Sequence, residues 1–381
     1  MNSVRYHQML VSPHLGGGEK VALELHNHVV TRCGPSSSHL WVPLGGVAEQ
    51  MVREKGYPYT PYNVDRLDSS GPVGTGLEGL RLFFHAFPYR GGIVHVHSPF
   101  VYGAARSFLR AARMKTVLHI HLDFTADNLR WALSSPPDRI VVCAQFMEKA
   151  VEQALQGIPR PPRISVIRNA IDTTRFFATD RSVAKARIGV AASEPLLMVV
   201  ANLAPHKGQE TAVRAVARLK ERAVFVKLWI VGTERSDGRG FLVRLQSLCA
   251  RLGVEDRVYF AGFRQDVPEL LQAADFLLLP STSEGLPLCI LEAQASRAVV
   301  LAAPTAGIPE VVTDRITGFL IAANDDAGYA ERLAALISNR VMTESIADVA
   351  AQLVKDRHNM PLYGDRILAE YDELLAAEEP A

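Results

Sequence analysis

The sequence predicts an α/β fold with two domains, each built on a parallel β-sheet with crossover helices. Short β-rich runs alternate with helical patterns along the chain, which is typical of parallel sheets. These runs form two series, separated by a polar stretch after Ala178. A chain of 381 residues is also long enough for two domains of ordinary size.

The apolar runs define the expected elements. The first series predicts strands at 7–12, 39–42, 92–97, 116–121, 139–143 and 164–167. The second predicts strands at 196–201, 226–231, 258–261, 276–279 and 299–302, with helices such as 208–221 and 240–252 between them. Apolar residues at helical spacing predict a terminal helix at 362–377. We expect an N-terminal domain at 1–177, a C-terminal domain at 178–360, and a final segment at 361–381 whose helix packs back toward the N-terminal domain.

Composition excludes several classes of protein. The 41 basic residues balance 40 acidic ones, so no general affinity for nucleic acid is expected. The longest uncharged stretches are too short for a membrane span, and the N-terminus lacks an apolar signal core. The four cysteines show no paired spacing, which argues against a zinc site or a disulfide framework. We expect a reduced, soluble, cytoplasmic protein.

Three loops have the composition of phosphate-binding turns. The first is LGGGEK at 15–20, which follows the first strand and precedes a helix. The second is 205–208, where Lys207 and Gly208 precede the next helix, and the third is 284–287. Glycine lets the backbone approach a ligand, and the amides at a helix start attract anions. Each loop alone fits a turn without a ligand; three together suggest one pyrophosphate held in a cleft between the domains.

Two glutamates flank the third loop, in the run STSEGLPLCILEAQAS. Glu284 precedes the turn, and Glu292 lies about one turn inside a helix that we expect to begin near Pro287. A glycosidase pair needs carboxyl groups about 5–9.5 Å apart, whereas eight helical positions span about 12 Å. The glutamates therefore more plausibly touch different parts of one elongated ligand, with two solvated acids on a capped helix as the alternative.

Ten of the twelve histidines lie in the first half of the chain. His95 and His97 share one face of a strand, and so do His119 and His121. Three interpretations remain open: structural histidines, histidines that contact a substrate, and metal ligands. If these histidines bind a metal, the protein would be a metal-dependent hydrolase.

Arg106, Arg110 and Arg113 recur at helical spacing and predict a basic helix face. Such a face is either simply solvated or attracted to an anionic membrane surface. In the second case the protein would be peripheral at the inner face of the membrane.

Taken together, these segments resemble the retaining glycosyltransferases of family four, which have two facing Rossmann-like domains with a cleft between them (the GT-B architecture). The resemblance is strongest from about 196 to 320. It is carried by VANLAPHKGQETAVRAV, by the long run LGVEDRVYFAGFRQDVPELLQAADFLLLPSTSEGLPLCILEA, and by GIPEVV and TGFLI. In the first half, the loop at 16–19 and VIRNAIDTTRF at 166–176 fit the same family.

The resemblance implies roles for individual residues. Glu284 would contact the donor sugar and Lys207 would neutralise the departing diphosphate, while Glu292 would bind the ribose. His121 matches the family's cleft histidine and is taken as catalytic, with His97 as a weaker acceptor-contacting choice. Backbone amides would hold sugar and phosphate at Gly17, Gly18, Gly285, Leu286 and Leu288.

The chain also departs from the family pattern. Asn202 stands where the family often has an arginine, so Arg264, Lys207 or a helix start must supply the missing positive charge. Ala144 replaces a usual serine, and Asn169 is followed by alanine rather than glycine. These differences weaken any transfer of donor identity.

We therefore predict a retaining glycosyltransferase. It would move a hexose or N-acetylhexosamine from a nucleotide diphosphate sugar to a hydroxyl of a glycan, lipid-linked or small-molecule acceptor. A UDP-sugar is favoured, with a GDP-sugar as the alternative donor. No cofactor or bound metal is expected. The rival functions are a nucleotide-sugar epimerase or phosphorylase of similar fold and a non-catalytic nucleotide-sugar binder.

Overall fold

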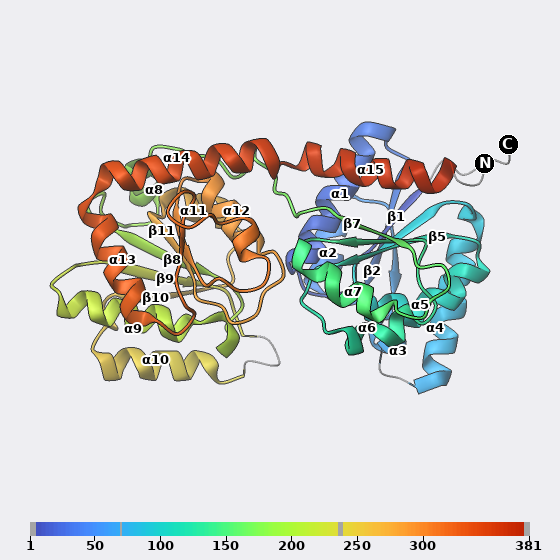
Figure 1. Cartoon of the computed structure of the whole chain (residues 1–381), viewed down its shortest axis with the longest axis horizontal. Coiled ribbons are helices and arrows are strands. Elements are labelled where there is room, and N and C mark those ends of the chain that lie inside the picture. The colour runs from blue at the N-terminus through green and yellow to red at the C-terminus, as the bar shows by residue number, and fades with distance from the viewer. Residues whose placement is uncertain (1–4, 69–70, 235–238, 377–381) are drawn as a thin grey trace. The chain divides into compact units, whose positions relative to one another are not determined.

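The computed structural model describes residues 5–68, 71–234 and 239–376. The chain forms two compact units. Unit 1 comprises Met1–Ala170 together with Met360–Ala381, and unit 2 comprises Ile171–Asn359. These divisions lie at 170 and 359, against the sequence-based boundaries at 177 and 360. Each unit is built on a parallel sheet with helices on both faces, so the predicted fold class is confirmed (Figure 1).

Unit 1 contains a seven-stranded parallel sheet in the order β3-β2-β1-β4-β5-β6-β7. The order reverses between β1 and β4, which is where parallel sheets of this kind bind ligands beyond the carboxyl ends of their strands. Its strands are β1 (Tyr6–Met9), β2 (Ser38–Pro43), β3 (Tyr59–Tyr62), β4 (Ile93–Val96), β5 (Lys115–Ile120), β6 (Arg139–Val142) and β7 (Arg163–Val166).

The helices of unit 1 bury apolar faces against this sheet. Helix α1 contacts β1 and β2, and α5 contacts β4 and β5 with α4 and α6 beside it. The helices are α1 (Gly17–Cys33), α2 (Val47–Glu54), α3 (Val64–Asp68), α4 (Gly71–Ala86), α5 (Pro99–Ala111), α6 (Ala126–Leu133) and α7 (Glu148–Ala154), with a 3-10 turn η1 (Phe87–Tyr89) after α4.

The C-terminal helix α15 (Met360–Ala376) belongs to unit 1, where it packs on α1. Its Tyr371 is fully buried and stacks on Tyr6 of β1, with ring centroids 5.2 Å apart. Glu370 lies 3.1 Å from the guanidinium of Arg139, at the start of β6. The last helix of the chain is thus fixed to the sheet by both apolar and ionic contacts.

Unit 2 contains a six-stranded parallel sheet in the order β10-β9-β8-β11-β12-β13, which reverses between β8 and β11. Its strands are β8 (Leu196–Val200), β9 (Lys227–Val231), β10 (Val258–Gly262), β11 (Phe276–Leu279), β12 (Val299–Ala302) and β13 (Phe319–Leu320). Its helices are α8 (Arg181–Arg187), α9 (Gln209–Glu221), α10 (Phe241–Leu252), α11 (Val267–Ala273), α12 (Leu288–Ala295), α13 (Asp326–Ser338) and α14 (Arg340–Arg357), and a 3-10 turn η3 (Pro205–Lys207) precedes α9.

Some elements were not predicted from the sequence. Between the strands predicted at 39–42 and 92–97, where no element was predicted, the structure has α2, β3, α3 and α4. Strand β13 was also missed, because it has only two residues and shows no periodicity. Within the described residues, no helix combines the length and the apolar character needed to cross a bilayer.

Candidate functional site

In unit 2, Lys207 and Glu284 form an ion pair at the point where the strand order reverses. Lys207 follows β8 and Glu284 follows β11, and these strands are neighbours in the sheet. The Lys207 Nζ atom lies 2.9 Å from Glu284 Oε1, and the two side chains are 20 % and 9 % exposed. An acid and a base that are 77 positions apart in the sequence therefore meet at the edge of the sheet where a ligand is expected.

The two loops that carry this pair are held together by their backbones. The amide of Thr282 donates to the His206 carbonyl at 2.8 Å. Gly208 has φ +71°, and a Cβ atom there would lie 2.1 Å from the carbonyl oxygen of Pro280. A side chain at position 208 would therefore both strain the backbone and push the loops apart. Glycine is required because Lys207 must reach Glu284 from a loop in direct contact with the loop after β11.

Helix α12 begins beside Glu284. Pro287 is its N-cap and makes no capping hydrogen bond through its side chain. The turn into α12 contains the residues expected to present amides to phosphate, Gly285, Leu286 and Leu288. The carbonyl of Gly285 accepts a hydrogen bond from the Gly307 amide at 3.0 Å, which fixes the turn. The predicted helix start near Pro287 is thus confirmed, and the turn has the geometry of an anion site.

Glu292 lies in the second turn of α12 with a buried side chain. A buried carboxylate is retained only when it is hydrogen-bonded or paired, and Glu292 does have polar interactions within the protein. Glu292 is therefore a buried carboxylate with polar interactions of its own, and not a solvated acid on the outer face of the helix.

The structure places both Asn202, which stands at the position of the missing arginine, and Arg264, one of its proposed substitutes. Asn202 is exposed, and its carbonyl accepts from the Gln209 side chain at 2.9 Å. Arg264 donates twice to Asp266, at 2.7 and 2.5 Å. This bidentate pair raises the Arg264 pKa and lowers that of Asp266, chiefly through the side-chain hydrogen bond. Arg264 and Lys207 are thus both paired with an acid, but Lys207 lies where the strand order of unit 2 reverses, which makes it the better candidate for diphosphate.

In unit 1, the glycine loop after β1 and His121 after β5 lie next to each other at the carboxyl ends of the two strands that flank β4. The amide of Gly16 donates to Glu19 Oε2 at 3.0 Å, which fixes the start of α1. Gly17 is exposed, and a Cβ at Gly18 would lie 3.3 Å from the His121 ring. The fold thus brings Gly18 and His121, 103 positions apart, into contact at the reversal of the strand order.

A chain of hydrogen bonds links His121 to the C-terminal helix. His121 Nε2 lies 2.9 Å from His97 Nδ1, and His97 Nε2 lies 3.1 Å from Gln8 Oε1. The Gln8 side-chain amide then donates to the Tyr371 hydroxyl at 3.0 Å. The same hydroxyl lies 2.6 Å from His95 Nδ1. The chain therefore runs from β5 through β4 and β1 to α15.

This chain assigns the tautomers of neutral histidines. A carbonyl oxygen only accepts, so the proton of His97 lies on Nε2. His97 Nδ1 must then accept, and His121 Nε2 donates to it. The Nδ1 atom of His121 is buried. The catalytic role predicted for His121 therefore requires its ring to break the hydrogen bond to His97. The contact with the acceptor substrate predicted for His97 likewise requires His97 to break its hydrogen bond to Gln8.

Burial keeps these histidines neutral. Desolvation lowers the pKa of His95 to about 3 and that of His121 to about 4, where a hydrogen bond with Asn169 opposes the shift. The pKa values of His97 and His119 are also held well below the usual range, first by desolvation and then by the neighbouring imidazoles. An imidazolium in this cluster would lack both water and a compensating anion.

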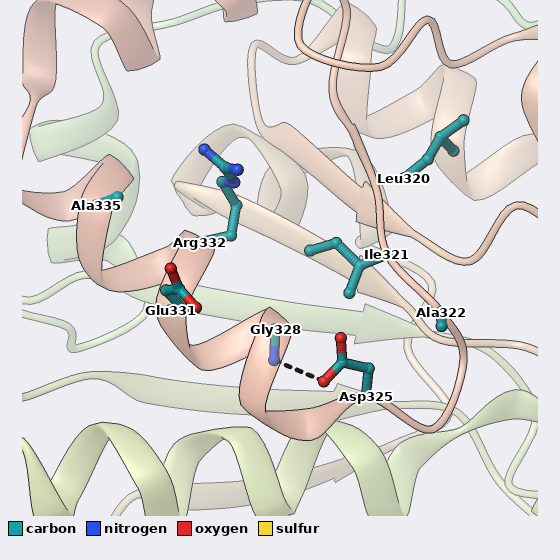
Figure 2. Close-up of a pocket in the computed structure, with 8 residues that line it drawn as sticks. All are labelled: Leu320, Ile321, Ala322, Asp325, Gly328, Glu331, Arg332 and Ala335. Carbon is teal, nitrogen blue, oxygen red and sulfur yellow. Dashed lines mark hydrogen bonds between the residues drawn. The ribbon is translucent and has the colours of Figure 1, made fainter.

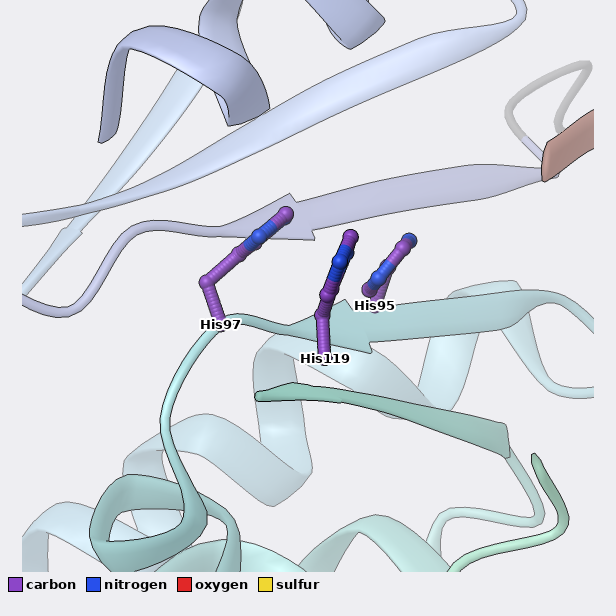
Figure 3. A group of neighbouring side chains, drawn as sticks. All are labelled: His95, His97 and His119. Atoms are coloured by element: carbon purple, nitrogen blue, oxygen red, sulfur yellow. The ribbon is translucent and has the colours of Figure 1, made fainter. Parts of the chain in front are cut away.

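His95, His97 and His119 bring potential metal-ligand atoms within 4.8 Å of one another. Their rings are stacked, with interplanar angles of 11° for His95–His97 and 28° for His97–His119 (Figure 3). Lone pairs lie in the ring planes, so in stacked rings they run side by side instead of meeting at one point, and zinc needs each nitrogen at about 2.0–2.1 Å. This arrangement does not favour the metal hypothesis.

The prediction that Arg106, Arg110 and Arg113 share one helix face was wrong for Arg113. Helix α5 ends at Ala111, and Arg113 has φ +55°. Arg106 donates to the Ala132 carbonyl at 2.7 Å, and its guanidinium lies over the Trp131 ring. Together with Arg110, these arginines line a cavity of about 260 Å³.

Another cavity, of about 330 Å³, lies beside α13 and contains none of the predicted site residues (Figure 2).

The sequence analysis did not identify Gln8 and Tyr371 as part of the site region. Gln8 is a buried polar residue within a short strand, and Tyr371 lies on the apolar stripe of the terminal helix. Two successive polar residues, His7 and Gln8, within a short predicted strand are the one signal that pointed to Gln8.

Two protein-family models match the chain. The model described as "Glycosyl transferases group 1" matches residues 180–353, and "Glycosyltransferase Family 4" matches residues 15–175. Among curated relatives, a D-inositol 3-phosphate glycosyltransferase of Nocardia farcinica is 35 % identical over 208 residues, which cover 53 % of this chain and 46 % of the relative. An N-acetyl-alpha-D-glucosaminyl L-malate synthase of Bacillus anthracis is 30 % identical over 211 residues, covering 55 % and 53 %. The chain thus spans about half the length of the curated relatives it matches.

Solved structures match the chain over nearly its whole length. HepE of Anabaena, crystallised in complex with UDP, has a TM-score of 0.82 at 22 % identity and covers 97 % of this chain and 100 % of its own. Sucrose-phosphate synthase of Thermosynechococcus elongatus has a TM-score of 0.80 at 16 % identity, covering 98 % and 99 %. At these identities the likeness shows the fold.

Proposed function

The chain belongs to the group 1, family 4 glycosyltransferases, and from this premise we propose that it transfers a sugar from a nucleotide diphosphate sugar to an acceptor hydroxyl. The observation that carries the proposal is the ion pair of Lys207 and Glu284, 2.9 Å apart where the strand order of unit 2 reverses. A cation beside uncapped helix amides suits a diphosphate, and a carboxylate next to it suits sugar hydroxyls.

In this proposal the donor lies along the turn into α12. The diphosphate binds the amides of Gly285, Leu286 and Leu288 together with Lys207, and Glu284 accepts from hydroxyls of the sugar. Glu292, further along the same helix, binds the ribose. From unit 1, Gly17 and Gly18 contribute amides to the diphosphate, and His121 contacts the reacting sugar after its ring leaves His97.

The reaction breaks the bond between the anomeric carbon and the diphosphate oxygen and forms a bond from that carbon to the acceptor oxygen. The acceptor proton passes to the leaving phosphate, and the nucleoside diphosphate departs. Lys207 and the helix amides stabilise the charge that develops on the leaving group, so the transfer needs no bound metal. Retention of configuration is part of the proposal and rests on the family resemblance.

A UDP-sugar is the donor that we propose first. HepE has been crystallised with UDP, with UDP and glucose, and with UDP-glucose. This supports testing UDP-glucose before other donors, with a GDP-sugar as the next choice. The acceptor is a glycan, a lipid-linked sugar or a small molecule.

Two rival functions depend on particular residues. Asn202, in place of the family's frequent arginine, favours a non-catalytic nucleotide-sugar binder. An epimerase or phosphorylase of similar fold would act on the donor without forming a new glycoside. Product analysis separates all three.

The first experiment is a ligand screen by thermal shift with UDP-, GDP-, ADP- and TDP-glucose. A donor present at 100 times its Kd stabilises the native state by about 2.7 kcal/mol, so UDP-glucose is expected to raise Tm clearly. Donor turnover with an acceptor panel then follows, with and without EDTA, and is expected to be equal in both. Stabilisation by none of the four sugars, or a product that is only an epimer or a sugar phosphate, would refute the proposal.

Glu292→Gln is expected to raise the Kd for UDP about tenfold, because a charge-assisted hydrogen bond contributes about 1.5–3 kcal/mol. Glutamine keeps the shape of this buried side chain. Glu269→Gln on α11, which is exposed, is the matched control and should leave Kd unchanged. Calorimetric titration with UDP measures both variants, and a Kd within twofold of wild type in Glu292→Gln would remove the ribose role.

A further inference from the structure

Helix α4 and the turn after it present an apolar stripe to solvent. Leu77, Leu80, Phe84 and Phe87 are 62, 48, 65 and 45 % exposed. The first three fall within about 60° of the helix circumference, at 100° per residue. Phe87 continues the series at the start of η1. We refer to these four residues as the α4 stripe.

The orientation of α4 is fixed by its opposite face. Glu78, Leu82 and Ala86 are buried. Gly79 packs so closely on α5 that a Cβ there would lie 2.0 Å from the Phe108 ring. The helix therefore cannot roll to bury the α4 stripe without losing these contacts. Isolated exposed apolar side chains are normal, but a contiguous row marks a surface that binds something.

The charged residues of the segment that carries the α4 stripe, 76–90, are mainly basic. Arg81 lies on α4 with its side chain 43 % exposed, and its guanidinium lies 3.9 Å from the buried carboxylate of Glu78. The guanidinium of Arg90 lies 5.5 Å from the centre of the Phe87 ring, and His85 is also exposed. Glu78 is the one acidic residue in the sequence from 76 to 90. Its carboxylate is buried and accepts from the Asn63 amide at 2.8 Å, so it presents no charge to a partner.

We propose that the α4 stripe binds the surface of an anionic lipid bilayer. An apolar stripe bordered by arginines is the pattern of helices that lie in the membrane interface, with side chains such as leucine and phenylalanine inserted and cations facing the headgroups. The basic border makes an anionic surface its complement. The contact is made by residues of α4 and η1, and not by Arg106, Arg110 and Arg113, whose spacing first suggested a membrane surface.

The test is flotation of the full chain with vesicles of phosphatidylcholine alone and with mixed phosphatidylcholine–phosphatidylglycerol vesicles. Wild type is expected to bind the anionic vesicles at least about tenfold better than the neutral ones. The double variant Leu80→Glu, Phe84→Glu is expected to lose about tenfold or more of this binding. Arg81→Glu with Arg90→Glu is expected to abolish the preference for phosphatidylglycerol while keeping the apolar contact.

The matched control is Val243→Glu with Val341→Glu, which places the same charges at exposed valines of unit 2 and should bind like wild type. Thermal melting of each variant shows that the fold is kept. Failure of wild type to bind anionic vesicles, or equal binding by the Leu80→Glu, Phe84→Glu variant, overturns the proposal. A wild-type dimer in light scattering that becomes monomeric in that variant, without vesicle binding, would identify the partner as a second copy and overturn it as well.

Discussion

Replacing Lys207 with alanine is expected to lower kcat by about 10²–10³-fold, which corresponds to about 2.7–4 kcal/mol of lost transition-state stabilisation. Its Nζ atom lies 2.9 Å from Glu284 Oε1, beside the uncapped start of α12. Negative charge grows on the leaving diphosphate as its bond to the sugar breaks, so the cation acts more strongly in the transition state than in the ground state. The Kd for UDP is therefore expected to change much less than kcat. Steady-state kinetics and calorimetric titration measure the two quantities.

The controls separate charge from structure. Lys355→Ala on α14 removes an exposed lysine of the same unit and should leave kcat unchanged. Lys207→Arg keeps the positive charge and should recover part of the lost activity, since the guanidinium differs in shape from the ammonium. Because Lys207→Ala leaves the nearly buried carboxylate of Glu284 without this cation, its Tm must be compared with wild type. Unchanged turnover in a folded Lys207→Ala variant would exclude Lys207 from the mechanism.

Unit 1 is expected to lose stability steeply as the pH falls below about 6.5, the usual pKa of histidine in an unfolded chain. Burial lowers the pKa of His7 and His95 to about 3 in the folded protein, and those of His97 and His119 are also depressed. Between about pH 6.5 and 4 the unfolded state therefore binds more protons, so the free energy of unfolding falls with the pH. Each such histidine contributes about 1.4 kcal/mol per pH unit.

Among the described residues, the groups named here that face this cluster are neutral. Tyr371 and Tyr363 lie against it from α15, and burial raises the pKa of both phenols. From β1, Gln8 contributes a neutral amide. Since whole domains are stable by only about 5–15 kcal/mol, several buried histidines together can unfold this unit in mild acid.

Urea titrations at about pH 7.5 and 5.5 measure the loss, and hydrogen exchange of β1, β4 and β5 assigns it to unit 1. His119→Leu is expected to recover about 1.4 kcal/mol at about pH 5.5 relative to its effect at about pH 7.5. Both ring nitrogens of His119 are buried with no hydrogen-bond partner among the described residues, so leucine removes no bond there. His14→Leu, at an exposed histidine of the same unit, should change stability by less than about 0.5 kcal/mol. Equal pH dependence in His119→Leu and wild type would show that the cluster is not responsible.

Most elements of the fold were predictable because each leaves a local signal. Strands β11 and β12 have the predicted bounds, and α9, α10 and α12 begin within one residue of the expected positions. Regions with weak local signals were not identified: β3 contains a proline, and the short helices α2 and α3 lie among turn-forming residues. Periodicity over four or five residues is too short to distinguish such elements from loops.

The candidate site was predictable to a different degree in each unit. In unit 2, the glycine of the 205–208 loop and the proline before α12 are local signals, and both loops were identified from them. In unit 1, His121 was identified from a resemblance, but its partner Gln8 was not, since a lone glutamine carries no spacing pattern. The resemblance also led to Arg264 as a possible replacement for a missing cation, although Asp266 already binds it.

The sequence by itself determined the two-domain α/β fold, the loops after β8 and β11, and the residue types available for phosphate and sugar. These depend on neighbours within a few positions, whose periodicity and turn chemistry are local. Only the tertiary structure decided that Lys207 meets Glu284, that Tyr371 joins the histidine cluster, and that Leu80 and Phe84 face solvent instead of the core. Strand order and helix orientation set these contacts, and both follow from packing between segments far apart in the chain, which no local pattern encodes.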